Sequence, residues 1–516
     1  MFRKTVILEP NTENKIKKIG LRIKKARLRR NISAETISKK AGIGESTFYA
    51  IERGVSTVSI GANAAVLSVL GLDCDLDVIA VDESGKKLFW EENLVDRKRA
   101  KRRKMDKKLP LPIGISDYCK VSSKYYYVDK TLLIRDFIDE RPQVSLFTRP
   151  CGFGKSLNMD MLRVFFERSE EDTSVYFRDK KIWECGKEYQ EYQGKYPVIY
   201  VTLKNVIGKN WETAYDFIYK MLRKEFEKHR ELLESDKISS FEKQYLTNML
   251  SGNVRVTDVS CALLNLSRML HVHYGVAPII IIDVYDAPIQ LGYVHGYYDK
   301  VVDFMRTLLS SGLKDNPHLS YGFLSGIMRL AKGDISSGLN NIKVNSIFDN
   351  RYSEYFGLTP DEVREMAEYY GVSEKYEELS EWYGGYCFGK TEIFSPRSVI
   401  EYFNNGCVPF AFRQPDEKND IISEVLSDVT TEVCEKLEFL IQGKSFVTYI
   451  NVDESYPQIQ SSKSSIIYNF LLMMGYLTVA AKDQAFGENY LYELVIPNKE
   501  ICCTTKDLLM KYFDAL

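Results

Sequence analysis

The sequence predicts a multidomain protein with an all-α head, an α/β core built on a parallel sheet, and a helical carboxyl-terminal part. Three observations lead to this expectation. Basic side chains gather near the amino terminus, strand and helix patterns alternate beyond Leu109, and helical periodicity returns after residue 399. We place these domains at residues 15–80, 109–398 and 399–516, with a basic linker at 81–108.

Charge is divided unevenly along the chain. Residues 1–108 carry 25 basic and 14 acidic side chains and the other residues carry 45 basic and 57 acidic ones, so the net charge of −1 conceals a basic head. A basic segment is typical of a polyanion-binding surface, although solvated charged helices have the same composition.

Composition argues against several classes of protein. The apolar content of 45% is that of a globular protein, and Ile279–Ile282 is far shorter than the ~20 residues of a membrane span. The amino terminus lacks the apolar core of a secretory signal, so we expect a soluble, cytoplasmic protein. The ten cysteines and five histidines show no Cys-x-x-Cys or metal-ligand spacing.

The head is expected to begin with three helices. The first is amphipathic, because almost every outward position between residues 15 and 30 is Lys or Arg. The second covers residues 34–40, with Ser33 as its N-cap and Gly42 at the turn that follows. The third begins near Gly44. The inward positions of the first helix are Ile16, Ile19, Ile23 and Ala26.

Residues 33–54 read Ser-Ala-Glu-Thr-Ile-Ser-Lys-Lys-Ala-Gly-Ile-Gly-Glu-Ser-Thr-Phe-Tyr-Ala-Ile-Glu-Arg-Gly. This pattern resembles the helix-turn-helix of the Cro and lambda-repressor-like (XRE) family, and the similarity continues through a further helix at residues 62–72. The resemblance implies that double-stranded DNA is a partner and that the third helix enters its major groove. The residues expected to contact bases or phosphates are Arg29, Arg30, Lys39, Glu45, Ser46, Thr47, Tyr49 and Arg53.

Two departures from that family leave an alternative open. Ala34 stands where the family usually has a DNA-contacting Gln, and Gly44 stands where a Ser often caps the third helix. A degenerate helix-turn-helix that binds protein is therefore the second interpretation. The linker that follows has nine Lys or Arg among residues 97–108, and it either adds non-specific phosphate contacts or only tethers the head.

The most informative junction of the core is a strand at residues 143–148 that leads into a loop ending in Gly-Lys-Ser. Such a loop directs backbone N–H groups and a helix N-terminus at a phosphate. Lys155 would neutralise β- and γ-phosphate oxygens and Ser156 would ligate Mg²⁺. Arg149 occupies the first glycine position of the G-x-x-x-x-G-K-S pattern. The expected nucleotide-binding residues are Cys151, Gly152, Phe153, Gly154, Lys155, Ser156 and Leu157.

A second apolar strand ends in a carboxylate. Residues 278–282 are Pro followed by four Ile, and Asp283 comes next. In a buried parallel strand this carboxylate would lie at the edge of the sheet where ligands bind, and it would hold Mg²⁺ together with Ser156. The pairing predicts a P-loop NTPase core that uses ATP and Mg²⁺. A buried strand that merely ends at a turn-forming Asp is the alternative.

Several separated motifs are similar to the bacterial AAA-ATPase-like family, whose members are often followed by a PD-(D/E)XK nuclease-like domain. A further stretch with Trp382 and Gly389 fits the tail of that ATPase module. No Asp…Glu-x-Lys constellation is evident before the chain stops at Leu516, so nuclease activity is not expected. The motifs are Leu111–Asp117, Tyr127–Thr131, Thr148–Asn158, Ile282–Pro288, Leu313–Pro317, Ser325–Arg329 and Ser337–Asn341.

Departures from this family bear on activity. Cys151 and Gly152 replace two arginines of its loop, and Val284 replaces the Glu that polarises the attacking water. Loss of such a group costs ~100- to 10,000-fold in rate, so we expect ATP binding with slow or absent hydrolysis. Asp286 would substitute only if the loop brings it round. Ser325 is the expected γ-phosphate sensor, and Arg329 is either the catalytic arginine or part of a structural salt bridge.

The carboxyl-terminal part has nine basic and seventeen acidic side chains over residues 399–516. We expect a winged-helix-like arrangement, whose acidity favours a packing role over DNA binding. Helical periodicity runs through residues 421–440. After it come a helix at residues 466–474, a two-stranded wing at 476–480 and 490–495, and a closing helix at 499–513.

The whole pattern predicts a DNA-binding, transcription-regulatory homo-oligomer that uses bound ATP as a switch. One alternative is an active ATPase of a defence or mobile-element system that the head recruits to DNA. Another is a pseudo-ATPase scaffold that binds proteins through both ends.

Overall fold

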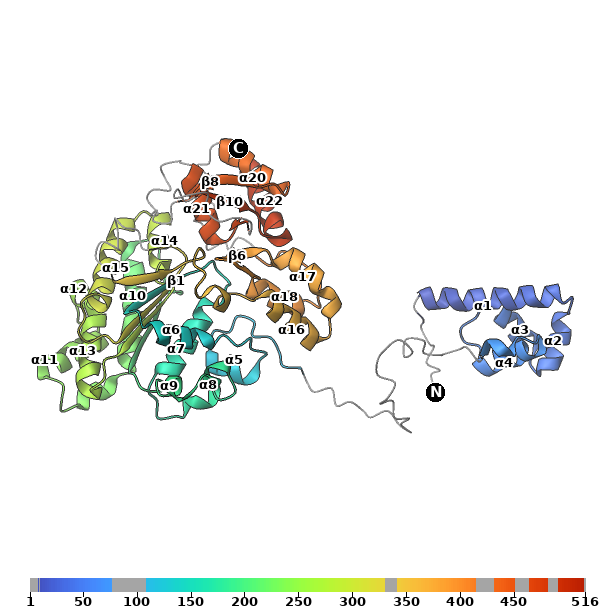
Figure 1. Ribbon diagram of the computed structural model, residues 1–516, viewed down its shortest axis with the longest axis horizontal. Coiled ribbons are helices and arrows are strands. Elements are labelled where there is room, and N and C mark those ends of the chain that lie inside the picture. Colours follow the sequence, from blue (N-terminus) through green and yellow to red (C-terminus); the bar gives the residue numbers. More distant parts are fainter. Residues whose placement is uncertain are drawn as a thin grey trace. The chain divides into compact units, whose positions relative to one another are not determined.

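The computed structural model describes residues 8, 10–76, 108–329, 341–413, 431–450, 464–480 and 491–514. Two compact units, residues 1–104 and 105–516, are described separately below (Figure 1). Nearly all of the predicted linker at residues 81–108 lies outside the described residues, as do most of the Ser337–Asn341 motif and the first half of the predicted helix at 421–440.

The first unit is a small helical domain around one apolar core. Its second helix has the predicted N-cap, because the Ser33 hydroxyl accepts the Thr36 N–H over 3.1 Å, and it ends at Gly42 with φ +68°. Phe48 and Ile51 of the third helix are buried as the spacing indicates. The helices are α1 (Pro10–Arg29), α2 (Ala34–Ala41), α3 (Glu45–Glu52) and α4 (Ile60–Val69).

The inward face of α1 differs from the predicted one. Ile19 is 47% exposed, and the helix instead approaches α3 through Gly20, where a Cβ would lie 2.4 Å from the Ile51 carbonyl oxygen. One turn beyond Ile23, Arg27 also faces inward and pairs with Glu52 over 2.7 Å. The prediction that Ile19 points inward was wrong because a glycine permits a closer helix contact than an isoleucine does.

The second unit is built on a five-stranded sheet in the order β2-β3-β4-β1-β5. All of its strand pairs are parallel, which confirms the predicted class of the core. β1 lies between β4 and β5, so β4 separates it from β3. The strands are β1 (Val144–Thr148), β2 (Val198–Thr202), β3 (Ile279–Asp283), β4 (Tyr321–Gly326) and β5 (Ile342–Asn345).

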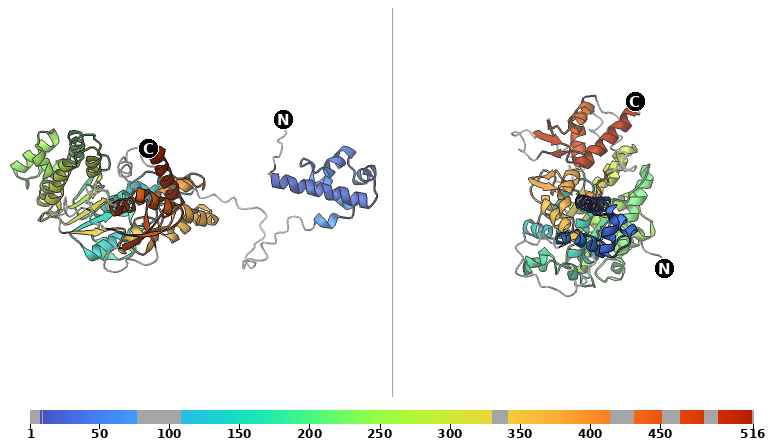
Figure 2. Two further views of the ribbon diagram at one scale, coloured as in Figure 1. Left: turned by 90° about the horizontal axis from the view of Figure 1, so that it is seen from above. Right: turned by 90° about the vertical axis from the view of Figure 1, so that its right-hand side faces the viewer.

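Helices cover both faces of the sheet (Figures 1 and 2). Successive isoleucines of β3 point to opposite faces. Ile280 and Ile282 pack in one cluster with α10, α13 and α15, while Ile279 and Ile281 pack in another with α6 and α7. Double burial explains why the strand is wholly apolar. The helices are α5 (Tyr118–Lys124), α6 (Leu132–Glu140), α7 (Lys155–Phe166), α8 (Lys181–Glu184), α9 (Lys187–Gln190), α10 (Trp211–Glu227), α11 (Ser240–Ser251), α12 (Val256–Ser260), α13 (Ala262–Tyr274), α14 (Ala287–Val294) and α15 (Tyr298–Leu313).

A small helical layer follows β5 and packs around its own apolar cluster, which includes Leu358, Leu379 and Tyr402. It contains α16 (Pro360–Tyr370), α17 (Tyr376–Tyr383), the hairpin β6 (Tyr386–Phe388) and β7 (Thr391–Ile393), and α18 (Pro396–Asn404).

The last part confirms the predicted helices at 466–474 and 499–513 and the antiparallel pairing of the two predicted strands. The wing is larger than expected, since β8 adds a third strand beside β10. The short, half-exposed β8 has no strong alternation, which is why the sequence did not reveal it. The elements are α20 (Thr431–Ile441), β8 (Phe446–Tyr449), α21 (Ser464–Met474), β9 (Thr478–Val479), β10 (Leu491–Val495) and α22 (Lys499–Asp514).

Candidate functional site

The loop between β1 and α7 has the backbone of a phosphate-binding turn. Gly152 and Gly154 adopt φ of +86° and +81°, values that favour glycine. Gly154 is the N-cap of α7 and offers no side chain to the first N–H groups of that twelve-residue helix. These N–H groups and the positive end of the helix dipole therefore face the loop, where an anion is favoured.

Lys155 is buried at the start of α7. Its ammonium donates hydrogen bonds to the carbonyl oxygens of Arg149 (2.7 Å) and Pro150 (2.9 Å). Burial lowers the pKa of Lys155, whereas nearby Cys151, Asp286 and Asp283 raise it. The Lys155 ammonium thus binds two carbonyl oxygens of the phosphate loop. From this position it would reach a phosphate bound by the loop.

Arg149, at the first position of the loop, directs its side chain toward the end of β5 and the segment that follows it. Its guanidinium is fully buried and donates to the carbonyl oxygens of Thr148, Asn345 and Tyr352. Burial lowers its pKa to about 9. The ring of Phe356 lies 5.0 Å from the guanidinium, a cation–π contact. A large residue therefore fits the glycine position because its side chain leaves the loop and ties β1 to the segment after β5.

Asp283 ends β3 at the carboxyl edge of the sheet, as expected. Its two neighbours in the sheet both bind it: the Ser325 hydroxyl donates to Oδ1 over 2.6 Å, and Thr202 donates to Oδ2 over 3.3 Å. Ser325 also accepts the Val284 N–H over 3.1 Å. The predicted sensor serine therefore contacts the carboxylate directly. Thr202 is a second hydroxyl partner of Asp283, and it was not among the predicted site residues.

The chain bends sharply after Asp283. Val284 has φ of +55°, a conformation that is strained for a β-branched residue. Two residues on, Asp286 is 1% exposed and is the N-cap of α14. The bend thus brings Asp286 close to the end of β4, where it contacts Ile327 and Met328. The sequence alone did not decide whether the loop would do so.

Asp286 uses only one of its two carboxylate oxygens. Oδ2 accepts the N–H groups of Ile327 (2.8 Å) and Met328 (3.1 Å), whereas Oδ1 is buried and has no hydrogen-bond partner among the described residues. Burial raises the pKa of Asp286, although those N–H groups and the charge of Lys155 oppose the shift. A buried carboxylate oxygen without a partner near Lys155 can accept a hydrogen bond from a bound water or ligand.

The remaining predicted site residues of the core differ in exposure and in contacts. Cys151 is exposed on the loop, and Ser156 is half-buried in the first turn of α7. The Phe153 ring is fully buried against Tyr386, so only its backbone remains for a ligand. Arg329 donates to the Ser346 hydroxyl over 3.2 Å. Its two predicted roles, the catalytic arginine or part of a structural salt bridge, both stay predictions.

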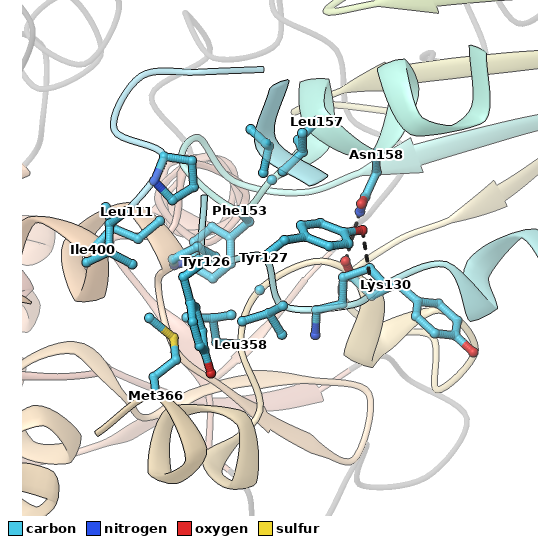
Figure 3. Close-up of a pocket in the computed structure, with 17 residues that line it drawn as sticks. Leu111, Tyr126, Tyr127, Lys130, Phe153, Leu157, Asn158, Leu358, Met366 and Ile400 are labelled. Atoms are coloured by element: carbon cyan, nitrogen blue, oxygen red, sulfur yellow. Dashed lines mark hydrogen bonds between the residues drawn. The ribbon is translucent and has the colours of Figure 1, made fainter. Parts of the chain in front are cut away.

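An apolar pocket lies beside the phosphate loop (Figure 3). Gly154 and Leu157 form one wall, and the segment before β1 contributes Tyr126 and Tyr127. The polar end of the pocket is already paired, since the buried Lys130 ammonium bonds to both carboxylate oxygens of Glu362 at 2.6 and 2.7 Å. The Tyr127–Thr131 motif contributes to the lining of this pocket. The sequence did not indicate that the motif lies beside the phosphate loop. Other lining residues are Leu111, Leu358, Met366 and Ile400.

The predicted DNA-contacting residues all belong to the helical head. Tyr49 is 47% exposed, and Glu45 and Ser46 are exposed beside it, while Thr47 is half-buried. Arg27 leaves the cationic face because it pairs with Glu52. The exposed basic residues of the predicted set are Arg29, Arg30, Lys39 and Arg53.

Comparison with known proteins supports the prediction that the core is AAA-ATPase-like. Residues 112–336 match the model of a family described as predicted AAA-ATPase. The relative described as "Uncharacterized protein in vnfD 5'region", from Azotobacter chroococcum mcd 1, is 23% identical over 418 residues, which cover 78% of this chain and 70% of the relative. No solved structure matches the chain. The chain therefore contains an AAA-ATPase-like domain, and neither comparison names a DNA-binding domain.

None of the described helices is long and apolar enough to cross a membrane.

Proposed function

We propose that the protein binds ATP with Mg²⁺ at the loop around Lys155, hydrolyses it slowly or not at all, and uses nucleotide occupancy to control DNA binding by its helical head. The observation that carries this proposal is the joint placement of Lys155, Asp283 and Val284. The first two supply the charges that a Mg-triphosphate needs, and the third leaves the usual position of the water-activating Glu without a base.

Mg²⁺ fits the side chains at the sheet edge. The ion prefers one or two carboxylates together with hydroxyl, water and phosphate oxygens. Asp283 and Ser156 offer that donor set, and Ser325 holds the Asp283 carboxylate in one orientation. When bound, Mg²⁺ would neutralise charge on the β- and γ-phosphates.

The apolar pocket suits the adenine base. It begins at Gly154 and Leu157, directly beside the phosphate loop, and it is lined by aromatic and aliphatic groups. Apolar and aromatic walls with a few polar groups close by are the usual composition of a small-molecule pocket. This arrangement supports one nucleotide that spans the pocket and the loop.

The head supports a DNA-binding role through its exposed groups. α3 presents Ser46 and Tyr49 to solvent on one face, while α1 carries basic residues along its length and only one acidic residue, Glu13, in its first turn. Basic side chains supply sequence-independent affinity, and short polar ones read base edges. In the proposed homo-oligomer two such heads would read neighbouring half-sites, as a transcription regulator does.

The test is DNA binding by the full chain over a range of salt concentrations, with and without Mg-ATP. We expect Mg-ATP to change the affinity or stoichiometry of the wild type but not of Lys155→Ala. Calorimetry should show ATP binding by the wild type and its loss in that variant. If ATP binds normally and never alters DNA binding, the switch is wrong although the nucleotide site stands.

Active hydrolysis is the second candidate, and Oδ1 of Asp286, which has no hydrogen-bond partner among the described residues, favours it. This oxygen is buried near Lys155, so it can orient a water in place of the missing Glu. The head would then recruit an ATPase to DNA, and DNA-stimulated turnover would be its signature.

A further inference from the structure

Arg397 lies directly over the phosphate loop. A Cβ placed on Gly152 would be 3.4 Å from the Arg397 Cβ and 3.8 Å from its Cδ. These two residues are far apart in the sequence, and α18 brings them together. The side chain of Arg397 is exposed, and it has no ion-pair partner within 4 Å among the residues that the structure describes.

The loop itself offers little free positive charge. The Arg149 guanidinium is buried and bonded to carbonyl oxygens such as that of Asn345, and the Lys155 ammonium is bonded to two loop carbonyls. Cys151 and Gly152, which form the exposed part of the loop, are uncharged. A second cation, supplied by another element, would therefore add to the charge of Lys155 on a bound triphosphate, and the Arg397 side chain contacts the exposed part of the loop at Gly152.

The same helix also reaches the apolar pocket. Pro396 and Ile400, one turn apart, line the pocket, while Arg397 lies between them in sequence and contacts Gly152. Successive helix positions differ by about 100° in direction, so α18 can touch the base with one face and the phosphates with another.

We propose that Arg397 is a phosphate-binding residue of the nucleotide site and supplies from α18 the charge that the loop lacks. This assignment rests on the proposed ATP binding. Because a guanidinium presents several donors in one plane, it matches phosphate oxygens well. Nucleotide affinity should therefore depend on this residue in proportion to the number of phosphates.

The experiment measures binding of ATP, ADP and adenosine to the full chain by calorimetry. Arg397→Ala should weaken ATP binding about tenfold or more, weaken ADP less, and leave adenosine unchanged. Lys390→Ala, which removes an exposed charge from the β6–β7 turn of the same layer, is the matched control and should leave all three affinities unchanged.

Restoring charge on the loop gives a second test. Cys151→Arg in the Arg397→Ala background should recover most of the ATP affinity, because position 151 is exposed beside Gly152. If Arg397→Ala binds ATP like the wild type while Lys155→Ala does not, the role of Arg397 is wrong and the nucleotide site stands. Absence of ATP binding by the wild type would overturn both.

Discussion

Ser325 donates a 2.6 Å hydrogen bond from the end of β4 to the carboxylate of Asp283 at the end of β3. The two residues are 42 positions apart and meet because their strands are neighbours in the sheet. The same hydroxyl accepts the Val284 N–H. One serine therefore orients the proposed Mg²⁺ ligand and the strained residue after it.

Ser325→Ala should lower the affinity for Mg-ATP by about tenfold, because the freed carboxylate can rotate and the Val284 N–H loses its acceptor. Titration of nucleotide binding against Mg²⁺ would show the loss. The control is Ser320→Ala, which removes a 2.7 Å bond to the Ala277 carbonyl at the other end of the strand. Equal effects of the two substitutions would mean that Ser325 acts only through stability.

Val284→Glu should raise the ATP hydrolysis rate by about 100-fold or more, since it returns a base to the position that normally orients water. Steady-state phosphate release is the measurement. Val284→Gln keeps the side-chain length without the base and should stay as slow as the wild type. Equally brisk hydrolysis by the wild type and Val284→Glu would contradict slow turnover.

Asp286→Asn separates the two candidate functions. The amide oxygen can still accept the N–H groups of Ile327 and Met328, so ATP binding should persist. If the wild type proves to hydrolyse ATP, this variant should lose about 100-fold in rate, whereas Asp299→Asn, at an exposed position in the first turn of α15, should not. A fully active Asp286→Asn would exclude this carboxylate as the base.

Gly475→Ala should weaken ATP binding as well as stability. Gly475 has φ of +80°, and a Cβ there would lie 2.8 Å from the Cβ of Pro150 in the phosphate loop. Gly443 has φ of +78° with nothing within 4 Å, so Gly443→Ala adds a similar backbone cost of about 1 kcal/mol without the clash. Calorimetric ATP binding and thermal unfolding of both variants separate the effects. Unchanged ATP affinity in Gly475→Ala would show that the carboxyl-terminal part does not influence the loop.

Stability should fall on the alkaline side of neutrality through His229. Burial by itself lowers the pKa of this imidazole, but Glu225 and Glu231 raise it to about 9. The raised value means that the ion pair stabilises the fold fully below about pH 6.5, and that this contribution is lost as pH rises through about 9. Unfolding free energy should drop by about 3 kcal/mol over this range. His229→Gln should flatten the profile in denaturant titrations, and an identical profile would refute the assignment.

Local patterns were enough to predict the elements that form the candidate site. The four isoleucines before Asp283 predicted a doubly buried strand, and the Gly-Lys-Ser sequence predicted the loop and the start of α7. Ser33 and Gly42 marked the ends of α2 for the same reason. Caps, glycine turns and apolar spacing act between residues that are close in the chain, so they can be read one segment at a time.

Contacts between distant segments could not be read in this way. The sequence by itself determined which segments form helices and strands and which residues end them. Only the tertiary structure decided that β4 lies beside β3, that Arg27 turns inward to Glu52, and that Arg397 covers Gly152. The physical reason is that strand order and helix packing are set by the fit of the whole apolar core, to which every segment contributes at once.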